Sequence, residues 1–376
     1  MRILFVIDQY DSANNGTTIS ARRFAEALAA RGNEVRVVSC GRSSKDKYAV
    51  PAIHLLPIAE HIVKSQGMQF AMPVSKQLKK ALEWADIVHF LMPFALSLRG
   101  LTLAEKLGVP HTAAFHVQPE NITFSIGLGN SERANNGIYN QFRDRFYNRF
   151  THIHCPSSFI AEELVKRGYT AKLHVISNGI SPSFHYSKAP KPAEYEGKYI
   201  LTMIGRYSAE KRQDILIEAA KLSKYADNIQ LVFAGQGPQK SKIEKLGQKL
   251  KNPPIMKFFS EEELNRLLSY SDLYCHTADV EIEAISCIEA FASGLVPVIA
   301  DAKLSATPQF ALDERSLFEA GNPKSLADKI DYWLDNAEER QKSELLYAEA
   351  GKQYHLDYCA EKAEEMFRQA IEESRR

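Results

Sequence analysis

Two glutamates, Glu281 and Glu289, are separated by seven residues in a segment that reads as a short helix, then Gly294, then a buried strand. Ionised carboxylates accept strong hydrogen bonds, and the hydroxyls of a sugar or a ribose are suitable donors. A structural interpretation fits the same residues, because Ser286 and Glu289 have the spacing of a capping box, with Ser286 as the N-cap. Both interpretations stay open, since a helix N-terminus can also bind an anion.

Two cations, Arg206 and Lys211, flank a predicted loop between a strand and a helix. Such cations can hold a pyrophosphate and stabilise the charge that develops on a departing diphosphate. The alternative is a pair of solvated basic residues at the start of a helix. That alternative is weak, because a helix N-terminus disfavours cations unless an anion is near.

Gly16 and His116 each follow a predicted strand. Gly16 would let backbone N–H groups approach a phosphate or a sugar. A helix-initiating loop, with Thr17 or Thr18 as the cap, explains this glycine about as well. His116 is a candidate sugar contact, although a lone histidine after a strand is more often structural.

Two glycine-containing turns are less specific. Asn178 precedes a glycine, and this dipeptide marks a tight reversal in many proteins. Gly235 and Gly237 form an incomplete phosphate loop, which is poor support for a phosphate site when taken alone.

Alternating apolar runs and amphipathic segments predict the elements that position these residues. We expect strands at 2–8, 34–40, 86–91, 111–115, 152–156 and 173–177, and then at 199–205, 229–234, 255–259 and 296–301. We expect helices at 18–31, 96–107, 158–167 and 212–222, and a charged helical tail from about 325. This alternation predicts doubly wound parallel sheets, in which ligands bind at the carboxyl ends of the strands.

The length of 376 residues suggests two domains. Prolines and lysines in the stretch 182–198 predict an exposed linker between them. We therefore expect an N-terminal domain at 1–185 and a C-terminal domain at 186–355. A final helix at 356–376 is expected to return to the N-terminal domain.

These motifs resemble those of family 4 retaining glycosyltransferases of the GT-B fold, and they occur in the family's order. They are the E-x7-E segment, the G-R-x4-K segment at 205–211, the N-G-I turn at 178–180 and the G-x-G loop at 235–237. Glu283 and Ala284 stand where the family usually has an aromatic residue and a glycine, so either Glu281 or Glu283 could face the donor. The family also has two adjacent glycines where this chain has Asn15 and Gly16.

The resemblance implies α/β architecture with two Rossmann-like domains facing across a cleft. It implies transfer of a hexose from a nucleotide diphosphate sugar, with a UDP-sugar favoured, to a glycolipid or cell-envelope glycan, with the anomeric configuration retained. By the same resemblance the acceptor attacks from the front face, the departing phosphate oxygen takes its proton, and no metal is needed. A GT-B nucleotide-sugar epimerase and a non-catalytic nucleotide-sugar-binding protein remain as alternatives.

The resemblance also assigns roles to residues. The residues implied in catalysis are Arg206 and Lys211 on the diphosphate, Glu281 on the sugar and His116 near the reacting carbon. The residues implied in donor binding are Glu289 on the ribose, with Gly16, Gly235, Gly237, Glu283, Ala284, Ile285 and Asn178.

Composition and charge bear on location and partners. Five scattered cysteines fit a reducing cytoplasm, and the apolar run after Arg2 is too short for a signal peptide. Residues 1–185 hold 21 Lys and Arg against 14 Asp and Glu, whereas residues 186–376 hold 26 against 32. Basic and aromatic residues in 58–80 and 133–150 could rest on an anionic membrane surface, although packing helices with solvated faces explain each stretch as well. No nucleic-acid partner is expected.

Overall fold

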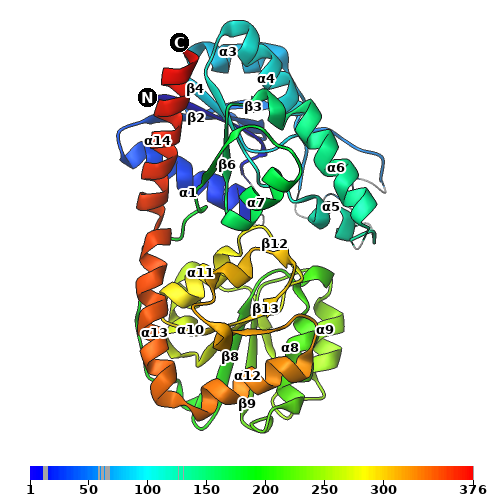
Figure 1. Cartoon of the computed structure of the whole chain (residues 1–376), viewed down its shortest axis with the longest axis vertical. Helices are drawn as coiled ribbons and strands as arrows, with labels where there is room; N and C mark the ends of the chain where they lie inside the picture. Colours follow the sequence, from blue (N-terminus) through cyan, green and yellow to red (C-terminus); the bar gives the residue numbers. More distant parts are fainter. Residues whose placement is uncertain are drawn as a thin grey trace. The chain divides into compact units, whose positions relative to one another are not determined.

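The computed structural model describes residues 1–11, 16–57, 60, 63, 68–125, 127–129 and 131–375. They form two compact units, Met1–Gly179 with Leu356–Arg376, and Ile180–His355. Each unit is built around its own parallel sheet with helices on both faces, as Figure 1 shows, so the predicted α/β class is confirmed. The division lies after Gly179, a few residues before the expected one at 185.

The first unit contains a seven-stranded sheet in the order β3-β2-β1-β4-β5-β6-β7, in which neighbouring strands are parallel. Its strands are β1 (Arg2–Gln9), β2 (Glu34–Cys40), β3 (Lys47–Val50), β4 (Ile87–Phe90), β5 (His111–Ala114), β6 (His152–Cys155) and β7 (Lys172–Val175). Its helices are α1 (Gly16–Ala30), α3 (Ser75–Trp84), α4 (Ala95–Leu107), α5 (Pro119–Ser125), α6 (Glu132–Arg145), α7 (Ser158–Lys166) and α14 (Leu356–Ser374), with a 3-10 turn η1 (Tyr147–Arg149).

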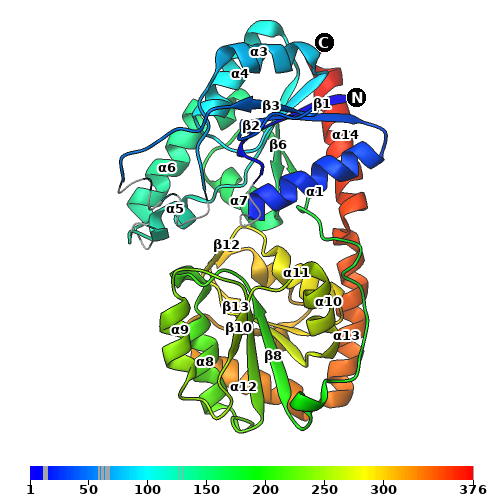
Figure 2. The same cartoon turned by 180° about the vertical axis from the view of Figure 1, so that it is seen from behind.

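Helices α1 and α14 cover one face of this sheet, and α3 and α4 cover the other (Figures 1 and 2). Alternate residues of β1 point to the first face, where Ile3, Phe5 and Ile7 pack against both helices. The burial of this shared apolar surface joins a helix from the end of the chain to the first strand.

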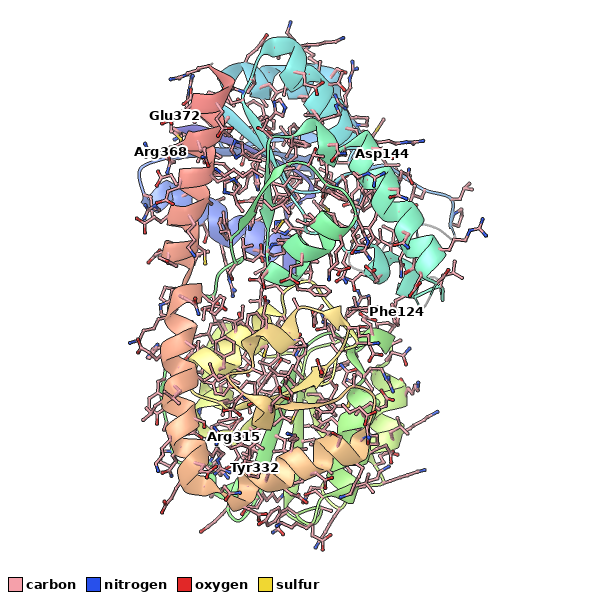
Figure 3. The ribbon with its side chains drawn as sticks, viewed as in Figure 1. Phe124, Asp144, Arg315, Tyr332, Arg368 and Glu372 are labelled. Atoms are coloured by element: carbon pink, nitrogen blue, oxygen red, sulfur yellow. The ribbon has the colours of Figure 1, made fainter. Side chains whose placement is uncertain are left out.

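Polar contacts also fix α14 to the first unit. Glu364 accepts hydrogen bonds from Arg31 Nε and Asn33 Nδ2, each at 3.0 Å. The exposed residues Arg368 and Glu372 lie on the outer side of the helix in Figure 3. The C-terminal helix is therefore part of the N-terminal unit.

The second unit contains a six-stranded sheet in the order β10-β9-β8-β11-β13-β15, and a two-stranded sheet of β12 and β14. The strands are β8 (Tyr199–Ile204), β9 (Ile229–Ala234), β10 (Ile255–Lys257), β11 (Leu273–His276), β12 (Val280–Glu281), β13 (Pro297–Asp301), β14 (Leu304–Ser305) and β15 (Leu317–Glu319). The helices are α8 (Gln213–Leu222), α9 (Lys240–Gly247), α10 (Glu261–Tyr270), α11 (Ile285–Ala292), α12 (Pro323–Asp335) and α13 (Ala337–Gly351), with 3-10 turns η2 (Ala193–Tyr195), η3 (Ala209–Lys211), η4 (Thr307–Phe310), η5 (Glu314–Ser316) and η6 (Lys352–Tyr354).

In this unit α8 packs against α12 on one face of the sheet, and α11 packs against α13 on the other (Figures 1 and 2). Gly351 of α13 is needed at that contact, because a Cβ there would lie 2.6 Å from Ala292 Cα. Helix α11, which carries Glu289, is thus packed closely on both of its sides.

Most aromatic side chains of the stretch 133–150 are not on the surface. Tyr139, Phe146, Tyr147 and Phe150 are buried in the first unit, and Phe142 is partly buried against its core. The membrane interpretation of these rings is therefore wrong, because the fold uses them as core. In the stretch 58–80, Ile62 and Lys64 lie outside the described residues, and the exposed members include Lys76, Lys79 and Lys80. Among the residues that the structure describes, no helix combines the length and the apolar character needed to span a bilayer.

Candidate active site

The carboxyl ends of β8 and β11 lie side by side, because these strands are parallel neighbours in the second sheet. The segment after β8 carries Arg206 and Lys211. Strand β11 ends at His276, and the short strand β12 follows with Glu281. One cation and one carboxylate of the prediction thus meet at the edge where parallel sheets bind ligands.

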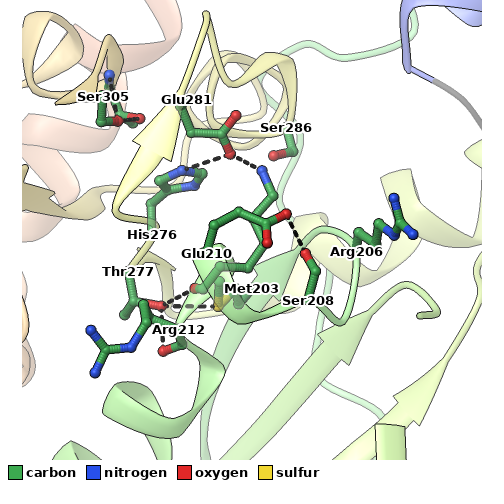
Figure 4. A network of polar contacts seen from close by, with 12 residues as sticks. Met203, Arg206, Ser208, Glu210, Arg212, His276, Thr277, Glu281, Ser286 and Ser305 are labelled. Carbon is green, nitrogen blue, oxygen red and sulfur yellow. Dashed lines mark hydrogen bonds and ion pairs between the residues drawn. The ribbon is translucent and has the colours of Figure 1, made fainter. Parts of the chain in front are cut away.

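Glu281 is at the centre of this cluster. Its Oε1 atom accepts a hydrogen bond from Lys211 Nζ and lies 3.3 Å from His276 Nε2 (Figure 4). Burial opposes the negative charge and raises the pKa of Glu281, but the charge of Lys211 and the contact with His276 outweigh burial and bring the pKa to about 2. The carboxylate is therefore ionised at neutral pH and is a strong hydrogen-bond acceptor.

A second set of contacts ties the Lys211 loop to the end of β11. The Thr277 hydroxyl lies 2.8 Å from the Lys211 carbonyl oxygen and 2.9 Å from that of Arg212, and donates to them. Arg212 adopts the left-handed conformation, with φ of +53°, and its guanidinium bonds Asp279 at 3.2 Å. These contacts hold Lys211 in place from both sides of the loop.

His276, Tyr274 and Thr277 were not anticipated from the sequence. Tyr274 and His276 lie on β11, and Thr277 directly follows it. This strand was not among the expected elements, because it is only four residues long and ends in a histidine. A histidine that follows a short apolar run, a few residues before the first glutamate of the motif, was the one signal available.

Arg206 lies on the same loop, but its side chain extends away from Glu281 in Figure 4. Its carbonyl oxygen accepts a hydrogen bond from Gln213 Nε2 at 2.8 Å. Burial lowers the pKa of Arg206 below its ordinary value, yet a guanidinium stays charged at neutral pH. The structure therefore joins Lys211, but not the Arg206 guanidinium, to Glu281.

The helix of the E-x7-E segment starts earlier than the capping-box interpretation requires. Helix α11 begins at Ile285, and its N-cap is Ala284, which makes no side-chain capping bond. Ser286 therefore lies within the first turn, where its hydroxyl is 3.1 Å from the Tyr274 hydroxyl. The expectation of Ser286 as N-cap is wrong, because the left-handed Ala284, with φ of +64°, turns the chain into the helix two residues before it.

Three acidic side chains of this segment are buried. Glu281 and Glu289 are 9% and 8% exposed, and Glu283 is 1% exposed. Burial raises the pKa of Tyr274 well above its ordinary value, and the nearby Glu281 and Glu289 add to that rise. Both Glu281 and Glu289 therefore lie close enough to Tyr274 to raise its pKa.

Packing explains why the loop after β9 contains glycines at positions 235 and 237. A Cβ at Gly235 would lie 2.0 Å from the Gly205 carbonyl oxygen, and one at Gly237 would lie 2.5 Å from the Tyr207 carbonyl oxygen. The Tyr207 N–H also donates to the Gln236 carbonyl oxygen at 3.0 Å. These glycines let two strand-end loops touch, so their presence does not require a phosphate.

The remaining candidates belong to the first unit. His116 and Asn178 line a narrow cavity of about 10 Å³, barely the space of one water. The His116 ring meets the His154 ring edge-on, with 5.3 Å between centroids, and burial together with His154 lowers the pKa of His116 well below its ordinary value. His116 is therefore a neutral hydrogen-bonding group near pH 7.

Gly16 is the first residue of α1, so neither Thr17 nor Thr18 is its N-cap. The Thr18 hydroxyl instead donates to the Gln9 carbonyl oxygen at 3.2 Å. A Cβ at Gly16 would meet no atom within 4 Å. The neighbouring Asn15 lies outside the described residues. Packing against the residues that the structure describes thus gives no reason for a glycine at position 16.

Two family sequence models together match most of the chain. Residues 14–184 match Glycosyltransferase Family 4, and residues 187–345 match Glycosyl transferases group 1. The matched segments follow the two structural units closely.

Individual relatives agree with the family models. The alpha-monoglucosyldiacylglycerol synthase of Streptococcus pneumoniae is 24% identical over 320 residues, which cover 80% of this chain and 71% of the relative. The GDP-mannose-dependent alpha-mannosyltransferase of Mycobacterium tuberculosis is 24% identical over 321 residues, covering 80% and 79%.

Among solved structures, Anabaena Alr3699/HepE in complex with UDP and glucose has a TM-score of 0.74 and 15% identity, and the match covers 97% of this chain and 98% of that one. At such low identity the likeness concerns the fold. With both family models matched along its two units and this fold in common, the chain belongs to glycosyltransferase family 4 and has the GT-B fold.

Proposed function

We propose that this glycosyltransferase moves a hexose from a nucleotide diphosphate sugar, with a UDP-sugar favoured, to a glycolipid or cell-envelope glycan, and retains the anomeric configuration. The observation that carries the proposal is the buried Glu281 carboxylate, held ionised beside Lys211 at the carboxyl end of the central strands. This pairing places Glu281, which can accept hydrogen bonds from sugar hydroxyls, next to Lys211, a cation that can bind a diphosphate.

Each charged group has a role in this proposal. Lys211 and Arg206 bind the donor diphosphate and stabilise its growing charge as the bond between the anomeric carbon and the phosphate oxygen breaks. Glu281 accepts hydrogen bonds from the sugar, and Glu289 accepts them from the ribose. The acceptor oxygen bonds the anomeric carbon on the face that the diphosphate leaves, and its proton passes to the departing phosphate oxygen.

The relatives' names support the substrate classes. One relative is named for a glucosyldiacylglycerol product, and both names specify alpha-linked chemistry. The other is named for GDP-mannose, so the panel of donors must include guanine as well as uracil nucleotides. That the reaction needs no metal stays a prediction.

The first experiment is a thermal-shift panel of UDP-, GDP- and ADP-sugars, since a ligand that binds the folded state raises the unfolding midpoint by mass action. The donor that shifts the midpoint is then incubated with enzyme and lipid extract, with and without EDTA. A new α-glycolipid in both samples is expected. Conversion of the sugar without any acceptor would indicate an epimerase, and binding without turnover would indicate a sensor.

We also propose contact with an anionic membrane through the exposed basic residues of the first unit, which include Lys76, Lys79, Lys80, Arg133 and Arg145. Co-sedimentation with phosphatidylglycerol vesicles should exceed that with phosphatidylcholine vesicles and should fall as salt is added. Equal binding to both lipids would contradict the electrostatic contact.

A further inference from the structure

The Oε1 atom of Glu281 has two partners from different elements, Lys211 of the β8 loop and His276 at the end of β11. His276 is 1% exposed, so water does not compete for its ring. Lys211 is also the cation that the proposed function places on the donor diphosphate. In the proposed function, the Lys211 amine therefore pairs with the Glu281 carboxylate in the free enzyme and with the diphosphate in the donor complex.

The contacts on the other side of the His276 ring are compatible with a proton on Nε2. The Tyr274 hydroxyl lies 3.1 Å from His276 Nδ1 and 3.1 Å from Ser286 Oγ. Burial keeps Tyr274 protonated, because it raises the pKa of this phenol well above its ordinary value. A chain in which Ser286 donates to Tyr274, and Tyr274 donates to His276 Nδ1, leaves the ring proton on Nε2. Nε2 lies 3.3 Å from Glu281 Oε1, close enough to donate after a small adjustment, although it makes no aligned hydrogen bond while Lys211 occupies that oxygen.

A buried carboxylate that loses its only partner is costly, because nothing replaces the water it gave up on folding. If Lys211 were the sole partner of Glu281, recruiting the amine to a diphosphate would leave that charge uncompensated. An N–H on His276 Nε2, 3.3 Å from the same oxygen, would remove this conflict by donating to the carboxylate once Lys211 has moved.

We propose that His276 is a positioning residue that holds the Glu281 carboxylate when Lys211 turns to the donor diphosphate. Donor binding then does not leave the buried carboxylate without a hydrogen-bond partner. This role rests on the proposed function. Tyr274 and Ser286 act through His276, since they orient its N–H toward the carboxylate.

Three substitutions separate the role from mere packing. H276Q keeps an amide donor near the Nε2 position, H276N keeps one near Nδ1 only, and H276L keeps neither. We expect H276L and H276N to raise the donor KM about tenfold, with a smaller change in kcat, and H276Q to recover most of that loss. Cys275→Ala, at a buried position on the same strand, is the control, and it should lower the unfolding midpoint without raising KM.

A second measurement does not depend on turnover. The 15N shifts of selectively labelled His276 should report a proton on Nε2, and Y274F should weaken that preference. A ring protonated on Nδ1 alone would overturn the proposal. So would an active wild-type enzyme whose donor KM is unchanged in H276L. A wild-type protein that binds no nucleotide sugar at all would instead overturn the proposed function, and with it the role that depends on it.

Discussion

At the scale of the residue, Glu281 stays ionised in a place where burial opposes its charge. The pKa falls from an ordinary 4.5 to about 2 because Lys211 and His276 together outweigh the loss of water. A group whose folded-state pKa is depressed contributes stability above its unfolded-state pKa, and that contribution is lost as the pH falls toward the folded-state value.

The first prediction concerns E281Q. We expect this variant to be less stable than the wild type at pH 7, by on the order of 2 kcal/mol, and to lose glycosyl transfer. The stability difference should narrow as the pH drops from about 5 toward 2, because the Glu281 carboxyl of the unfolded chain takes up a proton near its ordinary pKa of 4.5, whereas the folded carboxylate, with a pKa of about 2, stays ionised. Urea denaturation at several pH values measures this. E349Q, at an exposed glutamate, is the control, and an E281Q difference that stays constant with pH would refute the electrostatic account.

Ala284 is a second residue in an uncommon state, since its left-handed conformation is costly for any residue with a Cβ. The family has glycine at this place. We therefore expect A284G to be less destabilising than A290G, in the same helix, by about 1–2 kcal/mol. Both changes remove one buried methyl group, so the difference between them reports the strain at the N-cap Ala284 together with the cost of a glycine inside α11. Equal losses in urea denaturation would show that Ala284 carries no strain.

Part of the site could be predicted at this scale and part could not. Lys211 and Glu281 could be named from the sequence because a diphosphate calls for a cation and a sugar for a hydrogen-bond acceptor, and the structure brings these two side chains together. His276 was missed, because its contact with Glu281 depends on β11 entering the sheet between β8 and β13. The N-cap at Ser286 was mistaken, since a helix start set by a left-handed alanine has no signal in local spacing.

At the scale of the element, the strands with long apolar runs were predicted, and so were short ones such as β10, whereas β3, β11, β12, β14 and β15 were missed. β1 and β9 have six or more consecutive residues buried between helices, which makes a continuous apolar pattern. β3, β11 and β15 are three or four residues long. Such strands exist because neighbouring strands pair with them, so their own sequence gives little indication of them.

The two glycine loops give an element-scale prediction. G237A forces a Cβ against the Tyr207 backbone, where neither loop can yield easily, so we expect a loss of stability of about 2 kcal/mol or more. G16A meets no atom, and should leave stability within about 0.5 kcal/mol of the wild type. A fall in donor or acceptor affinity of G16A, measured by calorimetry, would then be due to the ligand. Unchanged affinity would show that Gly16 has no binding role.

At the scale of the whole molecule, the two units differ in how the chain builds them. The second unit is one continuous segment, Ile180–His355, whereas the first needs Leu356–Arg376 to cover its sheet. The expected linker at 182–198 belongs to the second unit, where Lys188 pairs with Glu344 at 3.0 Å and Lys191 with Asp272 at 2.6 Å. The composition of this segment predicted its exposure. It could not predict the ion pairs, because they join residues that are far apart in the sequence.

This difference predicts how fragments behave. A fragment of 180–355 should unfold cooperatively in urea, because it contains its complete sheet and core. A fragment of 1–179 lacks the buried Ala363, Met366 and Phe367 of α14, and so should expose an apolar face and bind a hydrophobic dye. Adding a peptide of residues 356–376 should restore cooperative unfolding, whereas the same peptide with Phe367→Asp should not, because it would bury an unpaired carboxylate. Cooperative unfolding of the 1–179 fragment without the peptide would show that this segment folds completely without the C-terminal helix.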